Sequence, residues 1–366
     1  MIIRIKALDT LFFRDGKPFN ASEDTVASGI FPPLPSVIYG ALRSAYFSWN
    51  VQDLKLANTP DDPTKMLRIC GIYLEIGNDI CLPLPADCIK LKGENKNEAY
   101  LLQPKKAPDV SSCPTPMVLA SPVGKGIKTV KDGLLDHIAI EDYLNLKTKE
   151  FYYFQLTDYI SPEPKVGIRR NKGTGTAEDH MLYRVNMQRL GTGIKRGIKS
   201  MELSLLVAYS GLDLPDKGLL KLGGEGKAVY YETLTKNEKN NIYLNPPAPK
   251  GNRFKLYLAT PTVFKGGWCP HWLTNPNLAG KYCGIKLRLL AAAVGKHIHV
   301  GGFDIKKNRP KFMCRGVPAG SVYYLEIVEG NMAGVIEAFH GANLSDYDSY
   351  ADQGFGLAFV GGIDND

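Results

Sequence analysis

Strand-like alternation of apolar and polar residues opens the chain, where Ile3, Ile5 and Ala7 alternate with Arg4 and Lys6. This is the period of a strand with one buried face. The same period, or a short apolar run between turn residues, predicts further strands at 68–76, 79–85, 201–207, 219–232, 254–259, 285–294, 321–327 and 354–362.

Helical spacing is found at two main places. After the proline-rich 32–35, Ser36 is a predicted N-cap, and one apolar face follows, made by Val37, Ile38, Ala41, Leu42, Ala45 and Tyr46. A second helix is predicted at 332–339, capped by Asn331 and ended by Gly341. A short helix at 140–146 interrupts a long segment that is rich in Pro, Lys and Gly.

The order of these elements predicts an α+β protein in two units. The first, 1–244, begins as a βαββαβ ferredoxin-like domain and carries an insertion around 86–200 that is too long for an ordinary loop. Residues 245–251, NPPAPKG, are the predicted linker, and 245–366 form the second unit with the same succession of strands and a glycine-rich last strand.

Positive charge is concentrated in one segment. The chain of 366 residues has a net charge of +8, and residues 166–199 alone contain eight Lys or Arg against two acids, a net of +6. Glycines divide the segment into short pieces, and Arg and Lys donate well to phosphate oxygens. We interpret it as a surface for a polyanion, most plausibly a nucleic-acid strand, with a solvated basic loop as the alternative.

Composition also bears on location and chemistry. The chain has no apolar run of membrane-spanning length, and its seven cysteines include no C-x-x-C pair, so we expect a cytoplasmic protein with no membrane partner. The segment LGGEGK lacks the Ser or Thr of a phosphate loop, and GTGTAE lacks the third glycine of a dinucleotide fingerprint. His297 and His299, like Cys269 and His271, lack zinc spacing, so we expect no cofactor and no metal.

Candidate RNA contacts follow from these patterns. In the basic segment they are Arg169, Arg170, Lys172, Thr174, Thr176, Tyr183 and Arg184. Lys227 adds a cation beside residues 223–226, GGEG, which we call the glycine loop. Trp268, Trp272, Phe264 and Tyr183 are candidates for base stacking. His180 beside Tyr183 would suit a metal-independent ribonuclease, but one His near one Tyr is weak evidence for catalysis.

Several motifs together resemble a known family. LFFRDGKPF at 11–19, PPLPSVIYGALRSAYF at 32–47, LATPTVFKGGWCP at 258–270, GVPAGSVYYLE at 316–326 and GFGLAFVGG at 354–362 resemble, in order, the third subunit of the Cmr module of type III-B CRISPR effectors, a RAMP-superfamily protein. The match spans nearly the whole chain, although 86–164 carries no motif that can be aligned.

This resemblance implies two ferredoxin-like, RRM-related RAMP domains with long insertions and no catalytic activity. It implies an RNA-binding subunit that, beside the large polymerase-like subunit and the adjacent backbone subunit, anchors the 5′ tag of the guide RNA in antiviral defence. It assigns tag binding to Arg14 and Lys17, to Arg43 on the helix, and to Gly223, Gly224 and Gly226. Alternatives are an ion pair for Arg14 and a solvated helix charge for Arg43. At the level of the protein, they are a guide-processing endoribonuclease of the superfamily or a protein-only adaptor.

Overall fold

The computed structural model describes residues 1–14, 26–27, 29–93, 96–108, 114–123, 126–191, 201–239, 242–248, 251–273, 277–304 and 309–364. Within these ranges, the side chains at 26–27, 169, 178–183, 237, 239 and 303–304 are not described. The protein is a mixed α/β structure whose strands pair almost entirely in antiparallel fashion. In the part of the chain that is described, no helix is both long and apolar enough to cross a bilayer.

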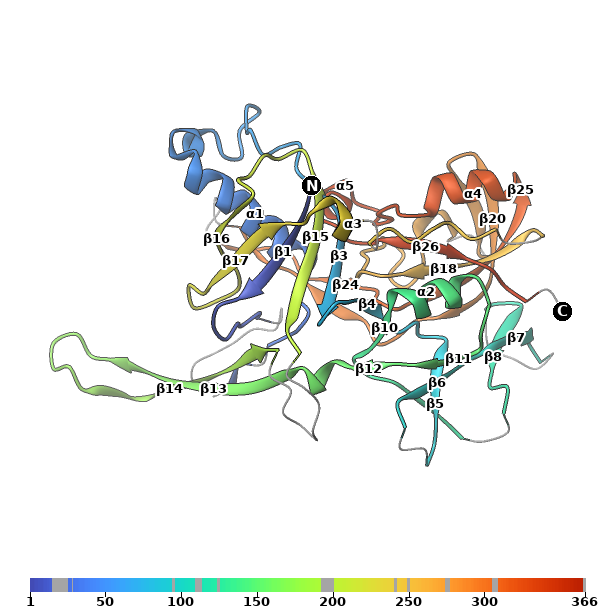
Figure 1. The fold of residues 1–366 in the computed structure, drawn as a ribbon, viewed down its shortest axis with the longest axis horizontal. Helices are drawn as coiled ribbons and strands as arrows, with labels where there is room; N and C mark the ends of the chain where they lie inside the picture. Colours follow the sequence, from blue (N-terminus) through green and yellow to red (C-terminus); the bar gives the residue numbers. More distant parts are fainter. Residues whose placement is uncertain are drawn as a thin grey trace.

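An eight-stranded antiparallel sheet forms the first layer of strands (Figure 1). Its order is β12 (Phe154–Gln155), β10 (Gly133–Asp136), β4 (Asp79–Pro83), β3 (Arg68–Ile76), β15 (Leu203–Ser210), β1 (Ile2–Ala7), β17 (Ala228–Thr233) and β16 (Lys217–Lys221). The predicted strands at 68–76, 79–85 and 201–207 are therefore confirmed, with the turn at Gly77 and Asn78 between β3 and β4. The broken strand predicted at 219–232 is the β16–β17 hairpin.

A five-stranded sheet forms the second layer. Its order is β19 (Ala279–Tyr282), β20 (Ile285–Ala293), β25 (Val322–Glu329), β18 (Arg253–Leu258) and β26 (Ala358–Gly361). Helix α1 (Pro35–Trp49) packs on the outer face of the first sheet, and α4 (Met332–Phe339) packs on the second sheet. A third core lies between the two sheets and is completed by α2 (His137–Leu144).

The side chains of β15 show how the alternation of residues along a strand places them in two different cores. Leu203, Leu205 and Val207 pack toward α1, whereas Leu206 and Ala208 pack toward the second sheet. Because successive strand residues point to opposite faces, a central strand covered on both sides must be apolar at both phases. β15 is buried from Leu203 to Tyr209 for this reason.

The predicted N-cap of the first helix is wrong. The helix begins two residues earlier than expected, with Leu34 as the N-cap and Pro35 in the first turn, and no side chain caps it. Proline suits the first helical position because its missing N–H would have no helical partner there. Asn331 does cap α4, accepting a hydrogen bond from the Gly334 amide at 2.9 Å, as predicted.

The segment 86–164 contributes β10 and β12 to the eight-stranded sheet and otherwise forms small sheets around α2. One sheet contains β11 (Glu150–Tyr152), β6 (Glu98–Leu101), β5 (Cys88–Leu91) and β9 (Ile127–Thr129), and another pairs β7 (Gln103–Lys106) with β8 (Met117–Ala120). The remaining helices are short: α3 (Lys236–Lys239), α5 (Asp348–Ala351) and 3₁₀ turns at Val51–Leu56, Leu156–Asp158 and His271–Leu273. Three further small sheets are described with the sites below.

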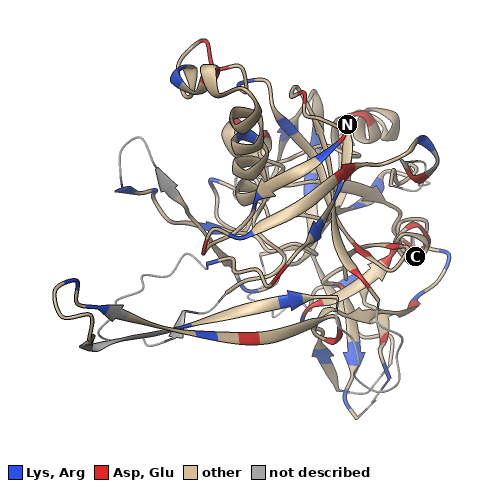
Figure 2. Ribbon diagram, turned by 60° about the vertical axis from the view of Figure 1, so that its left-hand side comes forward, with Lys and Arg blue, Asp and Glu red and all other residues tan. Residues whose placement is uncertain are grey.

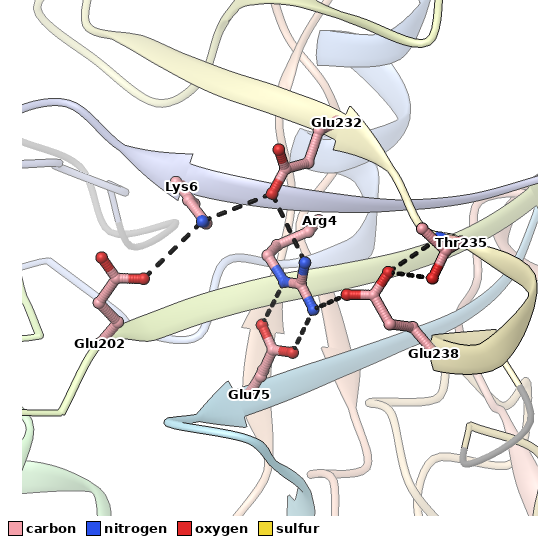
Figure 3. A network of polar contacts seen from close by, with 7 residues as sticks. All are labelled: Arg4, Lys6, Glu75, Glu202, Glu232, Thr235 and Glu238. Atoms are coloured by element: carbon pink, nitrogen blue, oxygen red, sulfur yellow. Dashed lines mark hydrogen bonds and ion pairs between the residues drawn. The ribbon is translucent and has the colours of Figure 1, made fainter.

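An arginine in the first strand joins several of these elements (Figure 3). Arg4 donates from Nε and Nη2 to the two carboxylate oxygens of Glu75 on β3, at 2.6 and 2.8 Å, and from Nη2 to Glu238 on α3 at 2.9 Å. Glu232 on β17 accepts from Nη1 at 3.5 Å. A planar guanidinium suits this bidentate geometry, so one side chain ties three strands and a helix together.

Candidate nucleic-acid interface

Most of the basic segment forms a long β-hairpin rather than a loop. β13 (Ile160–Arg170) and β14 (Ala177–Leu190) pair from Ile160↔Leu190 to Ile168↔Leu182, and β2 (Val26–Ala27) adds a short parallel strand to β14. We call this hairpin, residues 160–190, the first arm. It extends well beyond the body of the molecule (Figure 1). Residues 192–200, the basic end of the segment, lie outside the described residues.

The tip of the first arm is a compact polar turn. The Asn171 side-chain oxygen accepts hydrogen bonds from the amides of Gly173 and Thr174 at 2.8 and 3.2 Å. Gly175 has a positive φ of 71°, which glycine adopts without strain, and Arg170 donates from Nε to its carbonyl at 3.1 Å. The hydroxyls of Thr174 and Thr176 lie 2.7 Å apart and are exposed with Lys172. The tip therefore presents hydroxyl and cationic donors to solvent.

The base of the first arm is anchored to residues 9–14, which we call the opening segment. Leu11 and Gln188 exchange backbone hydrogen bonds, both of 2.8 Å, and Phe12 is buried against Val185 and Met187 on β14. These backbone hydrogen bonds and the buried Phe12 side chain fix the angle at which the arm leaves the body. The opening segment thus acts as the support of the arm.

Ion pairs complete this junction. Arg189 donates to Glu163 at 2.7 Å and lies 3.7 Å from Asp9, and Lys227 of the glycine loop pairs with the same Asp9. The hydrogen bond from Lys227 lowers the pKa of Asp9, and that from Arg189 lowers the pKa of Glu163. These cations are thus already neutralised by carboxylates at the base of the arm.

The glycine loop packs directly on the opening segment. Gly224 donates its amide to the Phe12 carbonyl at 2.8 Å, and a Cβ on Gly223 would lie 2.5 Å from the same oxygen. Gly223 and Gly226 both have positive φ, 83° and 65°. Gly223 and Gly224 are therefore closely packed on the opening segment, and Glu225 of this loop lies 3.0 Å from Lys165 on the arm.

The structure brings most of the predicted contacts to this region and places one elsewhere. The glycines, Lys227 and exposed Arg14 lie at the junction, and exposed Arg184 lies farther along β14. Lys17 lies outside the described residues, as do the side chains of Arg169 and Tyr183. Arg43 lies on α1, where its guanidinium donates to Asp62 at 2.6 Å, to Thr64 at 2.7 Å and to Asn58 at 3.3 Å.

Two predicted stacking candidates are buried, so no base can stack on them. Phe264 and Trp272 are 5% and 9% exposed in the core beneath the second sheet, whereas Trp268 is 41% exposed. Sequence reasoning missed the supporting residues Phe12, Asp9 and Glu163. No local pattern identifies them, because each acts through a partner that is distant in the sequence.

Charge is therefore distributed unevenly along the first arm (Figure 2). At the base, Lys165, Arg189 and Lys227 face carboxylates. Farther out, Lys172 and Arg184 are exposed and make no ion pair with any residue that the structure describes. The exposed apolar side chains of Val166 and Ile168, at 56% and 50%, lie beside them. Among the described side chains, the arm beyond Lys165 therefore offers cations without an ion-pair partner and exposed apolar surface.

Comparison with known proteins agrees with the sequence motifs. The sequence model of the CRISPR-associated protein (Cas_Cmr3) family matches residues 3–363. Comparison with the curated proteins finds no match. Two similar solved chains come from cryo-EM structures of the type III-B Cmr-beta complex, one bound to cognate target RNA and AMPPnP and one bound to cognate target RNA.

The two chains have TM-scores of 0.52 and 0.51, and each is 19% identical to this protein over 88% of this chain and 86% of its own. At this identity the structural likeness concerns the fold. The family match covers almost every residue and confirms the resemblance drawn from the motifs. The chain belongs to the Cas_Cmr3 family of CRISPR-associated proteins.

Proposed function

We propose that this protein is a non-catalytic RNA-binding subunit of a type III-B Cmr effector complex. It anchors the 5′ tag of the guide RNA, docks on the large polymerase-like subunit beside the adjacent backbone subunit, and serves antiviral defence. Family membership and the fold shared with chains of RNA-bound Cmr-beta complexes support this role. The observation that carries it is the first arm, whose base is hydrogen-bonded to the opening segment and whose described cations Lys172 and Arg184 have no ion-pair partner among the described residues.

The arrangement suits holding a strand more than cutting it. Lys172 and Arg184 supply charge to phosphates, and the hydroxyls of Thr174 and Thr176 supply neutral donors. The glycine loop keeps its backbone close to the opening segment, where Arg14 is exposed. A strand of constant sequence needs only a fixed path of such donors.

The topology supports two ferredoxin-like domains, with a boundary near 245. In the first sheet, the order β3-β15-β1-β17 is that of a ferredoxin-like sheet, with α1 following β1. In the second, β20-β25-β18-β26 has the same order, with α4 before the last strand. Each unit thus retains one of the two helices of the motif, and long connections take the place of the other.

The proposal is tested with the Lys172→Ala and Arg184→Ala double variant. Fluorescence anisotropy of the full-length chain with labelled single-stranded RNA that carries the repeat-derived tag is measured against salt. Two lost phosphate contacts should reduce the slope of log K against log salt by about 1.4. The matched control is Lys217→Ala with Lys221→Ala, two exposed lysines of β16, which should leave the slope unchanged.

Crosslinking within the assembled complex separates the alternatives. Guide RNA that carries a photoreactive base at its 5′ end should crosslink to the first arm and emerge uncut. Cleavage of a precursor repeat by the purified chain, abolished by His180→Ala, would favour the ribonuclease. Crosslinks confined to other subunits, together with an unchanged salt slope, would favour the protein-only adaptor.

A further inference from the structure

A second, smaller hairpin projects from the C-terminal half. β21 (Ile298–Val300) pairs with β24 (Cys314–Gly316), and β22 (Phe303–Asp304) continues against β23 (Arg309–Pro310). The Lys311 amide donates to the Gly302 carbonyl at 2.9 Å between the two pairs. We call the described residues of 296–316 the second arm.

Cations on the second arm are free. Residues 295–316 contain six Lys or Arg and one acid, Asp304, a net of +5 in a chain whose total is +8. Four of the six are described and exposed: Lys296, Arg309, Lys311 and Arg315. None of these four makes an ion pair or a side-chain hydrogen bond with the residues that the structure describes. This contrasts with the base of the first arm, where carboxylates face the cations.

Phe312 lies on the same arm with 91% of its surface exposed, the most exposed of the large apolar side chains described. It lies directly between Lys311 and Met313, which is itself 46% exposed. A fully exposed phenyl ring beside lysines is the pattern of a stacking platform in a single-strand binding surface, because the ring takes a base of any sequence. A lone ring also differs from a contiguous apolar patch, which would indicate a protein partner.

Lys296, His297, His299 and Arg315 lie near one another on the second arm. His299 is directly opposite Arg315 in the β21–β24 register, and the rings of His297 and His299 are perpendicular at 5.3 Å. Partial desolvation and the nearby charges of Arg315, His299 and Lys296 lower the pKa of His297. Cationic groups that lie close together, with no carboxylate paired to them among the described side chains, favour the binding of an anion.

One short stretch of chain links the two arms. Val26–Ala27 pairs with β14 of the first arm, and Gly29 forms a bridge with Arg14. The next residues, Ile30 and Leu34, pack in one cluster with Ile298, Val300 and Cys314 at the base of the second arm. The two arms are thus joined through 26–34, with Arg14 beside that stretch.

We propose that the second arm binds single-stranded RNA, with a base stacked on Phe312 and phosphates held by Lys311, Arg315 and Lys296. This contact extends the RNA path beyond the segment held by the first arm, and it depends on the proposed function only in the choice of RNA as ligand. Interface cores between proteins are depleted in lysine, whereas here the ring follows Lys311 in a segment with a net charge of +5. The charge pattern therefore favours RNA over a protein partner.

The test measures anisotropy of fluorescein-labelled oligo(U), long enough to reach both arms, with the full-length chain. Phe312→Leu, which keeps an apolar side chain but removes the ring, should weaken binding about fivefold to a hundredfold, the range for loss of a stacked base. Phe312→Tyr should restore binding. Double-stranded RNA of equal length should bind the wild type and Phe312→Leu alike, since its bases are already stacked.

A charge variant provides the second readout. Lys296→Ala, Lys311→Ala and Arg315→Ala together should reduce the salt slope by about 2, whereas the Lys217→Ala and Lys221→Ala control should not. All these positions are exposed, and circular dichroism verifies that each variant is folded. Unchanged oligo(U) binding in both the Phe312→Leu and the charge variant overturns the inference.

The outcome is independent of the test of the first arm. Loss of RNA binding in the Lys172→Ala and Arg184→Ala variant, with no effect of the second-arm variants, would overturn this inference and leave the proposed function standing. The reverse result would place RNA on the second arm and refute the first arm as the main site. Second-arm variants that bind RNA normally but fail to assemble with other subunits would assign the surface to a protein.

Discussion

Glycines in the loop at 223–226 differ in what a side chain would meet. At Gly223 a Cβ would lie 2.5 Å from the Phe12 carbonyl oxygen, a separation that requires the backbone to move. At Gly226 no atom lies within 4 Å of the Cβ position, so only the positive φ of 65° is unfavourable. A comparison of the two positions therefore distinguishes the effect of close packing from the effect of backbone conformation within one loop.

We predict that Gly223→Ala destabilises the protein more than Gly226→Ala does. The left-handed conformation costs an alanine about 1 kcal/mol at either position. Gly223→Ala adds the clash with Phe12, which also disturbs the support of the first arm. Thermal unfolding of the two variants measures the difference. Equal melting temperatures would show that the loop and the opening segment are not in close contact.

At the scale of elements, the ion pairs of the first sheet differ in how deeply they are buried. Arg4 and Glu75 are largely buried, with 17% and 9% of their side chains exposed, and they form a bidentate pair. Lys6, on the same strand, is 38% exposed and lies 3.4 Å from Glu232 and 3.8 Å from Glu202. Removing one partner of a buried pair lowers the free energy of unfolding more than removing one partner of an exposed pair.

We predict that Arg4→Met lowers the free energy of unfolding by about 3 kcal/mol, because Glu75 is left buried without its cation. Lys6→Met, the matched change on the same strand, should alter it by less than about 1 kcal/mol. Urea unfolding followed by circular dichroism measures both. Similar, small effects would mean that Glu75 finds water or another donor when Arg4 is lost.

Elements with a strong local period were predictable, and those set by tertiary partners were not. The strands at 68–76 and 285–294 and the helix at 332–339 follow from apolar spacing and turn residues. The start of α1 was misjudged because Pro35 and Ser36 both suit a helix start, and the structure uses the proline. The hairpin at 160–190 was interpreted as a glycine-divided ribbon. Most of it lies outside the body, and its buried side chains near the base, such as Val185 and Met187, are too few to impose a clear period along the segment.

The candidate site shows the same limit. Net charge in 166–199 singled out the segment that forms most of the first arm, but sequence cannot say which cations are neutralised by distant acids. Asp9 lies far from Arg189 and Lys227 in sequence and pairs with both. The second arm was visible in principle as six Lys or Arg in 295–316, yet only its histidines drew attention. Whether the predicted residues contact RNA stays a prediction.

For the chain as a whole, the net charge is concentrated in two sequence segments. Residues 166–199 contribute +6 and 295–316 contribute +5, so the rest of the chain carries −3 in a protein of +8. A polyanion would thus be attracted to these two segments and mildly repelled by the rest of the chain. This distribution concentrates the electrostatic attraction for a polyanion on the two basic segments and leaves the rest of the chain for contacts that do not depend on positive charge.

The body is held together by a polar cluster between its two sheets. Asp87, which is fully buried, accepts hydrogen bonds from Tyr143 of α2 at 2.8 Å and from Tyr324 of β25 at 2.7 Å. Lys255 of β18 is 1% exposed, with Nζ 3.3 Å from the centre of the Tyr143 ring and without a hydrogen-bond partner among the described residues. Burial lowers the pKa of Lys255 from its usual 10.5 to about 8, even though Asp87 opposes the shift.

This lowered pKa makes the junction of the two sheets sensitive to pH. Below about pH 8, Lys255 is charged in both the folded and the unfolded protein, so the folded state bears the cost of a buried cation. Above that value the folded protein releases the proton while the unfolded chain still holds it up to about pH 10.5. The unfolded state then binds more protons, so this group increases stability as the pH rises. Cys88, Asp364 and the tyrosines 143, 257 and 324 also face the cluster.

The buried Cys88 and Tyr143 have raised pKa values and act in the opposite direction, because the unfolded chain loses their protons first. Their contribution cancels when wild type is compared with Lys255→Met, which keeps the length of the side chain without the amine. The difference in unfolding free energy, wild type minus variant, should rise by about 2 kcal/mol between about pH 7 and pH 9.5. Urea titrations at several pH values measure this difference. A difference that stays constant over the range would mean that Lys255 keeps its proton in the fold, with Asp87 compensating its burial.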